Sequence, residues 1–370
     1  METKKYRFDE VTINFDKKRI PLSSAQREKR QGTFRYYGAQ GVIDHVDDYI
    51  YDGTYLLIAE DGENLKSKKQ NIAQVVDGQF WVNNHAHIVQ GNEQCDTRFL
   101  CYLINSMDLS GYVTGSAQPK LSQANLNAIT LSLPTLVEQK RIVEYLYMLD
   151  QKIDVNRQIN DNLADLLQTV YQERFGDTSL IANQGILSDI CSYSRDKVAV
   201  SELNVSTYFS TENMLSGKAG STEATSLPTT SQTTACHKGD TLISNIRPYF
   251  KKIVYCEDNC GCSTDVLCFT PSQPRYSAYL FSTLYADKFF AFMVAGSKGT
   301  KMPRGDKQQI MTYPVVLPSE EELAGFNIIA SPLLEQIYSN SAENKRLSIL
   351  RDTLLPKLMS GEIDVSAIQL

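Results

Sequence analysis

The feature that most constrains this 370-residue chain is an internal repeat with a period near 180 residues. Thr135 with Glu138 and Ser319 with Glu322 each have the spacing of a capping box, a pair that begins a helix, and each follows a Leu-Pro pair. The two boxes are 184 residues apart (319 − 135), and the same offset relates four further pairs: Ile153 and Ile337, Asn156 and Asn340, Asn160 and Asn344, Leu163 and Leu347. Matches at one offset predict a chain built from two copies of one unit.

Apolar residues and asparagines recur at alternating steps of four and three after the first capping box. This a/d pattern is typical of a coiled-coil helix, and we expect about 35 to 40 helical residues, some 55–60 Å long, with Gly176 as the stop. The seam positions are Ile142, Leu146, Leu149, Ile153, Asn156, Asn160, Leu163, Leu167 and Val170.

A less regular seam follows the second capping box. Its positions are Phe326, Ala330, Leu333, Ile337, Asn340, Asn344, Leu347, Arg351 and Leu354. Ser331-Pro332 is expected to kink or restart the helix, because proline lacks an N–H and favours the first helical turn. We therefore expect a firm helix from about Pro332 to Leu358.

Both seams can be buried if the two helices pair with each other, antiparallel, within one chain. The asparagines then lie near the middle of both seams. We interpret them as residues that set the register at some cost in stability; the alternative is that they are partly solvated and have no special role.

The segments between the helices are predicted to be mixed α/β. Strands are expected at 55–59, 80–82, 87–89, 241–244, 252–255 and 266–269, helices at 98–107 and 275–295, and a flexible loop at 221–234. The expected fold is α+β, with domains at 1–134 and 178–318 and spacer helices at 135–177 and 319–370 that form an antiparallel coiled coil with a pseudo-twofold repeat.

The net charge and the cysteine content exclude few classes of function. The net charge of −6 is carried mainly by the two helical segments, at −3 and −4, whereas the globular segments carry −1 and +2. The N-terminus lacks an apolar signal region and no segment resembles a membrane span, so we expect a cytoplasmic protein. Cys256, Cys260, Cys262 and Cys268 do not have a usual zinc spacing; we interpret them as buried thiols and expect no metal.

Several motifs resemble those of specificity subunits of type I restriction–modification enzymes. The stretches Phe34-Arg-Tyr-Tyr-Gly-Ala-Gln-Gly-Val-Ile-Asp44, Asp52-Gly-Thr-Tyr-Leu-Leu-Ile-Ala59 and Phe80-Trp-Val-Asn-Asn-His-Ala-His-Ile88 resemble a target-recognition domain. Lys238-Gly-Asp-Thr-Leu-Ile-Ser-Asn-Ile-Arg-Pro-Tyr249 resembles part of a second one, and residues 133–143, 156–160 and 354–364 resemble the family's spacer helices. The resemblance covers nearly the whole chain.

The resemblance implies a subunit that reads a split, asymmetric DNA site with its two domains. Its spacer helices would dock two methyltransferase subunits, and translocase–nuclease subunits would complete the complex. S-adenosylmethionine, ATP and Mg would be bound by those partners and not by this chain.

Candidate DNA contacts are basic residues interleaved with aromatic or amide residues on expected loops. In the first domain they are Lys17, Arg19, Arg27, Arg30, Arg35, Tyr36, Tyr37, Gln118 and Lys120; in the second they are Asn245, Arg247, Tyr249, Lys251, Lys298, Lys301 and Arg304. The loops Gly115–Leu121 and Gly296–Met302 are the strongest candidates, since both read Gly-Ser-x-x-x-Lys. An ordinary solvated charged face is the alternative for each residue.

Two other classes of function were weighed. A stand-alone DNA-modifying enzyme is disfavoured because the chain has no phosphate-binding loop, no Asn/Asp-Pro-Pro-aromatic motif and no Pro-Asp of the common nuclease core. A structural coiled-coil scaffold explains the heptads but not the paired domains. Asn83, Asn84 and His85 are expected to form a hydrogen-bonded turn, with a catalytic or ligand role as the alternative. No catalytic residue is predicted.

Overall fold

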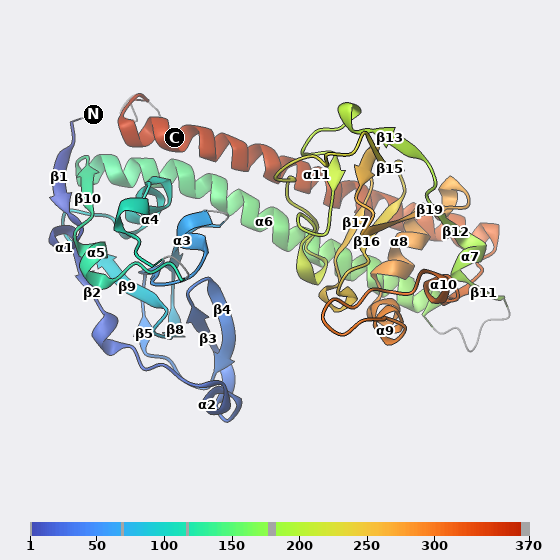
Figure 1. The fold of residues 1–370 in the computed structure, drawn as a ribbon, viewed down its shortest axis with the longest axis horizontal. Helices are drawn as coiled ribbons and strands as arrows, with labels where there is room; N and C mark the ends of the chain where they lie inside the picture. The colour runs from blue at the N-terminus through green and yellow to red at the C-terminus, as the bar shows by residue number, and fades with distance from the viewer. Residues whose placement is uncertain (1, 68–69, 116–117, 177–182, 364–370) are drawn as a thin grey trace. The chain divides into compact units, whose positions relative to one another are not determined.

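The computed structural model describes residues 2–67, 70–115, 118–176 and 183–363. The chain divides into two compact units, one made of residues 1–153 with 345–370 and the other of residues 154–344 (Figure 1). Each unit therefore contains one globular part and a portion of both long helices. The finer division into four segments stays a prediction.

The globular part of the first unit contains three sheets. β1 (Lys4–Arg7) pairs with β10 (Thr130–Leu133). An antiparallel sheet has the order β2 (Thr12–Asn14), β9 (Ala86–Gly91), β6 (Tyr55–Ala59), β7 (Ala73–Val76). The third sheet has the order β4 (Gly41–Val46), β3 (Gln31–Gly38), β8 (Gln79–Val82), β5 (Tyr51–Asp52), with β3 and β8 parallel.

Short helices complete this part: α1 (Phe8–Val11), η1 (Asp16–Lys18), α2 (Ser24–Glu28), α3 (Asn64–Ser67), α4 (Thr97–Ser106), η2 (Ser110–Tyr112) and α5 (Gln123–Asn127). Asp96 caps α4 by accepting the N–H groups of Arg98 and Phe99, as expected for an N-cap carboxylate. Phe99 and Leu56 are buried in a core that also receives Ile142, Leu146 and Leu358 from the long helices.

The second unit repeats much of this plan. β11 (Gln184–Ile186) pairs with β20 (Pro314–Val316). An antiparallel sheet has the order β12 (Cys191–Tyr193), β19 (Val266–Pro271), β16 (Thr241–Ser244), β17 (Ile253–Tyr255). The third sheet has the order β13 (Lys197–Ala199), β15 (Gln232–Cys236), β18 (Cys260–Cys262), β14 (Tyr208–Phe209). The central strands β15 and β18 of this sheet are antiparallel, whereas the central strands β3 and β8 of the third sheet in the first unit are parallel. The two copies therefore differ in this sheet.

The helices of the second globular part are α7 (Leu187–Ile190), η3 (Val200–Glu202), η4 (Ser216–Lys218), η5 (Pro248–Phe250), η6 (Pro274–Tyr276), α8 (Ser277–Tyr285), α9 (Asp287–Ala295) and α10 (Lys307–Ile310). The single helix expected at 275–295 is wrong: the extended backbone of Ala286 separates α8 from α9. The last three residues of the loop expected at 221–234 belong instead to β15, which begins at Gln232.

The two long helices are α6 (Leu136–Phe175) and α11 (Glu320–Ser360). Both predicted capping boxes form: the Thr135 N–H donates to Glu138 Oε2 at 2.9 Å, and the Ser319 N–H donates to Glu322 Oε2 at 2.8 Å. Gly176 follows the last residue of α6, as predicted. Among the described residues, none of the helices is long and apolar enough to cross a lipid bilayer.

The expected break at Ser331-Pro332 is wrong, because α11 runs without interruption from Glu320 to Ser360. Pro332 removes the hydrogen bond to the carbonyl of Ile328. Ile328 is 76% exposed and Pro332 is also exposed, so water can bind the freed carbonyl oxygen and the helix continues.

Within each unit, α6 and α11 pair antiparallel. In the first unit Arg351 Nη1 lies 2.7 Å from Asp150 Oδ1. In the second unit Asn156 Nδ2 donates to Asn344 Oδ1 at 2.9 Å and Asn340 Nδ2 donates to Asn160 Oδ1 at 2.8 Å. The predicted antiparallel coiled-coil pairing is confirmed.

The predicted seam residues are buried to different degrees. The buried positions are Ile142, Leu146, Ile153, Asn156, Leu167, Phe326, Ala330 and Asn340. The partly buried positions are Leu149, Asn160, Leu163, Val170, Leu333, Ile337, Asn344, Leu347, Arg351 and Leu354. Leu334, and not its predicted neighbour Leu333, is the buried leucine of that turn.

Candidate nucleic-acid interface

Two predicted DNA-contact segments of the second unit lie side by side. The turn formed by η5 follows β16, and the loop at 298–304 closes on itself through bonds between Lys298 and Arg304. The Arg247 N–H donates to the carbonyl of Pro303 at 2.8 Å, which joins the turn to the loop. We call Arg247, Tyr249, Lys251, Lys298, Lys301 and Arg304 the second-domain basic surface.

The turn in this surface has a strained backbone. Arg247 and Lys251, on either side of η5, have φ values of 51° and 50°, in the left-handed region that non-glycine residues rarely adopt. Lys218, whose N–H donates to the Lys251 carbonyl, has φ of 65°. Such strain is concentrated at binding and catalytic sites, where surrounding contacts maintain it.

The strained turn presents aromatic rings to solvent. Tyr249 is 50% exposed and the adjacent Phe250 is 38% exposed. Exposed aromatic side chains beside basic residues suit contact with nucleic-acid bases and phosphates. Sequence reasoning missed Phe250, although it is adjacent to the predicted Tyr249.

Carboxylates partly neutralise the basic surface. Lys251 and Lys218 both contact Asp287 Oδ1, at 3.0 and 2.7 Å. Hydrogen bonds from Lys218 and Lys251 lower the pKa of Asp287 below its ordinary value. Similar pairs join Lys298 to Asp306 and Arg304 to Asp265. Lys301 is exposed.

The first unit separates its predicted residues into two groups. Arg19 and Lys120 meet at Glu60, whose Oε2 lies 2.9 Å from Arg19 Nη1 and whose Oε1 lies 3.3 Å from Lys120 Nζ. Lys17, in η1, and Gln118, in the loop that carries Lys120, are exposed. Ser116 and Ala117 of that loop lie outside the described residues.

The other group lies around β3. Arg27 binds Asp44 at 2.8 Å and lies over the ring of Tyr36, and Arg30 binds Asp47 at 2.9 Å and lies over Trp81. Arg35 is exposed and donates to the carbonyl of Asp77. These arginines therefore already have partners within the first unit.

Three predicted contacts require correction because their side chains are buried. Tyr36 and Tyr37 are 0% and 4% exposed and pack in the cores beside β3, where Tyr36 Oη accepts the N–H of Leu22. Asn245 is 8% exposed, and its carbonyl accepts the N–H of Gly305, next to the 298–304 loop. Asn245 therefore positions the basic loop and is not itself a surface contact.

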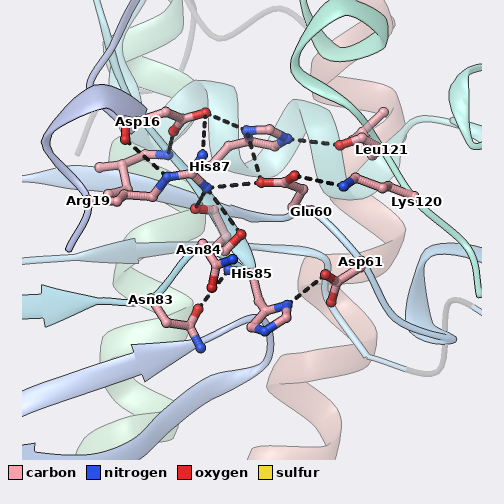
Figure 2. A network of polar contacts seen from close by, with 12 residues as sticks. Asp16, Arg19, Glu60, Asp61, Asn83, Asn84, His85, His87, Lys120 and Leu121 are labelled. Atoms are coloured by element: carbon pink, nitrogen blue, oxygen red, sulfur yellow. Dashed lines mark hydrogen bonds and ion pairs between the residues drawn. The ribbon is translucent and has the colours of Figure 1, made fainter. Parts of the chain in front are cut away.

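A buried ionic network supports the Lys120 loop, and sequence reasoning missed it (Figure 2). His87, 1% exposed, lies between Asp16 and the loop: its Nδ1 is 2.6 Å from Asp16 Oδ2 and its Nε2 is 2.8 Å from the Leu121 carbonyl oxygen. Arg19 also contacts Asp16, at 3.5 Å. Ion pairs therefore connect Asp16 to Arg19, Arg19 to Glu60, and Glu60 to Lys120.

The charges in this network follow from its hydrogen bonds. Burial acts to raise the pKa of Asp16, but hydrogen bonds from His87 and the Ile88 N–H outweigh it, so the pKa lies below its ordinary value. The same balance, with Arg19 as the principal donor, lowers the pKa of Glu60. The ionised Asp16 carboxylate and the Leu121 carbonyl oxygen lie on opposite sides of the His87 ring, one beside each ring nitrogen.

The predicted turn beside this network forms. Asn83 Oδ1 accepts the His85 N–H at 2.8 Å, and His85 Nδ1 lies 2.7 Å from Asp61 Oδ2 (Figure 2). Within the described part of the chain, no group of three or more His, Cys, Asp or Glu side chains is arranged to hold a metal ion.

Known proteins of one family resemble this chain. A family model described as the type I restriction modification DNA specificity domain matches residues 2–164. A solved S subunit of a type I restriction–modification system from M. genitalium has the same fold over 97% of this chain and 96% of its own, with a TM-score of 0.58 and 16% identity. Residues 2–164 therefore match a type I DNA specificity domain, and the chain shares the fold of that S subunit.

Curated members of the family match only in part. A putative type I restriction enzyme specificity subunit of Haemophilus influenzae is 36% identical over 138 residues, which is 37% of this chain and 35% of that protein. The EcoprrI specificity subunit of Escherichia coli is 26% identical over 125 residues, 33% of this chain and 30% of that protein. Each match spans about a third of the relative's length.

Proposed function

We propose that this chain reads a bipartite, asymmetric DNA site, with one half bound by each globular part. The observation that carries the proposal is the repetition, among the described residues, of two of the three sheets of a unit whose first copy lies within the match to the type I DNA specificity domain. Each copy also has a Gly-Ser-x-x-x-Lys loop whose last lysine is exposed in the first unit, at Lys120, and in the second, at Lys301. Contacts of basic residues with phosphates would orient each copy on the duplex.

The chain binds and positions DNA, while partner subunits supply the chemistry. S-adenosylmethionine, ATP and Mg are bound by those partners in this proposal, which also places the complex in the cytoplasm. The missing nucleotide-binding and methyltransferase motifs support this division of labour.

An apolar stripe on α6 is our candidate for methyltransferase docking. Met148, Val155, Ile159 and Leu166 are 40–48% exposed. Steps of seven, four and seven residues place all four on one face of a helix with about 3.6 residues per turn. Exposed apolar residues that gather on one face mark protein interaction sites.

Footprinting of the full chain with its methyltransferase subunits on genomic DNA fragments tests the proposal. We expect protection of two short segments separated by an unprotected gap of fixed length. Exchange of residues 178–318 for those of another family member should change one half-site and leave the other unchanged.

Protection of a single continuous site would contradict the bipartite proposal. Binding of labelled S-adenosylmethionine by the isolated chain would contradict the assignment of methylation chemistry to the partners. A scaffold without a role in DNA recognition predicts that the exchange of residues 178–318 leaves the protected sequence unchanged.

A further inference from the structure

Five of the eight cysteines lie in one buried cluster of the second unit: Cys236, Cys256, Cys260, Cys262 and Cys268. Cys236 on β15 is the direct cross-strand partner of Cys260 on β18. Cys262 is two residues further along β18 and Cys268 comes from β19. The DNA-reading proposal gives this cluster no role.

Two thiols of the cluster are close enough to react with each other. The Sγ atoms of Cys256 and Cys260 are 3.6 Å apart, across a turn that joins β17 to β18. Asp258 and Asn259 in this turn are exposed, and Asp258 Oδ2 accepts a hydrogen bond from Tyr338 Oη. Cys268 instead donates to Asp240 Oδ2 at 3.2 Å, which keeps that thiol protonated.

One of the two cysteines, Cys260, lines a cavity, and its residue is 6% exposed. A cavity of about 260 Å³ is lined by Cys260, Cys236, His237, Asn259 and Lys197 among others. Cys256 is 3% exposed and does not line this cavity. The cavity therefore offers a route toward Cys260 and not toward Cys256.

The neighbouring thiols favour ionisation of Cys260. Hydrogen bonds from Cys236 and Cys256 lower the pKa of Cys260, and the nearby His237 acts in the same direction. The hydrogen bond to Cys260, together with burial, raises the pKa of Cys256. A thiolate held beside a protonated thiol is the state from which thiol oxidation proceeds, because the thiolate is the nucleophile.

We propose that Cys260 and Cys256 form a site of reversible oxidation by hydrogen peroxide. The Cys260 thiolate attacks one peroxide oxygen, the O–O bond breaks, and the leaving hydroxide takes a proton to become water. The Cys256 sulfur, as it loses its proton, then attacks the sulfenic sulfur; the S–O bond breaks, and the leaving hydroxide takes up that proton as the second water. Overall, two thiols and one peroxide give one disulfide and two waters.

Cys256 is assigned as the resolving thiol because its Sγ lies 3.6 Å from that of Cys260. A disulfide between Cys260 and its cross-strand partner Cys236 is the competing outcome, because paired strands hold Cα atoms within the range of a disulfide. A thiol reductant such as glutathione reverses the reaction by exchange.

Peptide mapping of the purified full chain by mass spectrometry, after peroxide treatment and alkylation of remaining thiols, tests the site. We expect a linked Cys256–Cys260 peptide that dithiothreitol reverses, formed about tenfold faster than modification of Cys191, a buried thiol outside the cluster. Cys256→Ser should instead leave a sulfenic acid at Cys260 that dimedone traps, and Cys260→Ser should abolish both products.

Cys95→Ser, which replaces a buried thiol of the first unit, is the matched control and should form the linked peptide at the same rate. Circular dichroism establishes that each variant is folded before its thiols are compared. Equal oxidation of all eight cysteines, a different linked pair, or one zinc ion per chain held by these thiols in the untreated protein would each overturn the proposal.

Discussion

The side-chain amide of Asn340 on α11 donates a hydrogen bond to the amide oxygen of Asn160 on α6, at 2.8 Å. Asn156 makes the corresponding bond to Asn344, at 2.9 Å. Under the offset of 184 residues, Asn156 corresponds to Asn340 and Asn160 to Asn344, so each bond is the image of the other. The antiparallel register of the helix pair therefore follows the symmetry of the repeat.

Replacement of these amides tests their role in the register. We expect Asn160→Leu to lower the free energy of unfolding by about 1–3 kcal/mol, because it leaves the Asn340 amide buried without its partner. The double variant Asn160→Leu/Asn340→Leu should recover most of that loss, since two leucines can pack across the seam. Urea unfolding of the two single variants and the double variant gives the coupling energy. Additive losses would contradict a pairwise role.

The ionic network around His87 is expected to stabilise the first unit. Asp16→Asn removes the charge that His87 and Arg19 contact and should lower the free energy of unfolding by about 3 kcal/mol at pH 7. Asp154→Asn, which removes an exposed carboxylate paired with Arg157, is the control and should have little effect. Urea unfolding measures both.

The parent protein and Asp16→Asn can also be compared across pH to test whether the Asp16 charge is the source of the stabilisation. The folded-state pKa of Asp16 lies below its ordinary value of 3.8, so the stabilisation is present above about pH 4 and is lost as the pH falls through the folded pKa. The difference between the parent and Asp16→Asn should therefore shrink below pH 4. A difference that stays constant down to pH 2 would show that the Asp16 charge is not its source.

Local patterns predicted the helices, but the site residues depended on distant partners. The capping boxes and heptads are encoded within a few residues, and Thr135 with Glu138 formed as expected. Arg19, by contrast, is directed inward by Glu60, 41 residues away, and the strand position of Tyr36 gave no indication that its side chain faces a core. The error at Pro332 had another cause: whether proline ends a helix depends on whether the freed carbonyl can reach water.

Asp287 is expected to weaken DNA binding, because it holds Lys218 and Lys251 in ion pairs. Asp287→Asn should tighten binding to the second half-site about two- to fivefold at low salt and steepen the dependence of log K on log salt by about 1 to 2, as released lysines reach phosphates. Fluorescence anisotropy over an about fourfold range of salt, from about 50 to about 200 mM, measures both effects. Asp154→Asn is again the control, and weaker binding by Asp287→Asn would contradict a phosphate-contact role for these lysines.

The stripe on α6 predicts a selective loss of partner binding. Ile159→Asp places a charge within the exposed apolar face and should abolish co-purification of the methyltransferase subunit, while the free energy of unfolding changes little because the residue is 40% exposed. Gln172→Asp adds the same charge on another exposed face of the helix and should retain the partner. Retention by both variants would place the docking surface elsewhere.

The helix pair is also expected to set the gap between the two DNA half-sites. The register that joins Asn156 to Asn344 places Ile153 opposite Leu347, so seven residues inserted after each keep the heptads in phase. Each helix lengthens by about 10 Å at 1.5 Å per residue. This corresponds to about three base pairs at 3.4 Å each. Footprinting should show both half-sites unchanged and the gap enlarged.

Insertion in α6 alone should destabilise the pair, because the seam of α11 then has no matching residues over one heptad. Full affinity for the original gap in the doubly extended protein would reject the proposal that the helices determine the spacing.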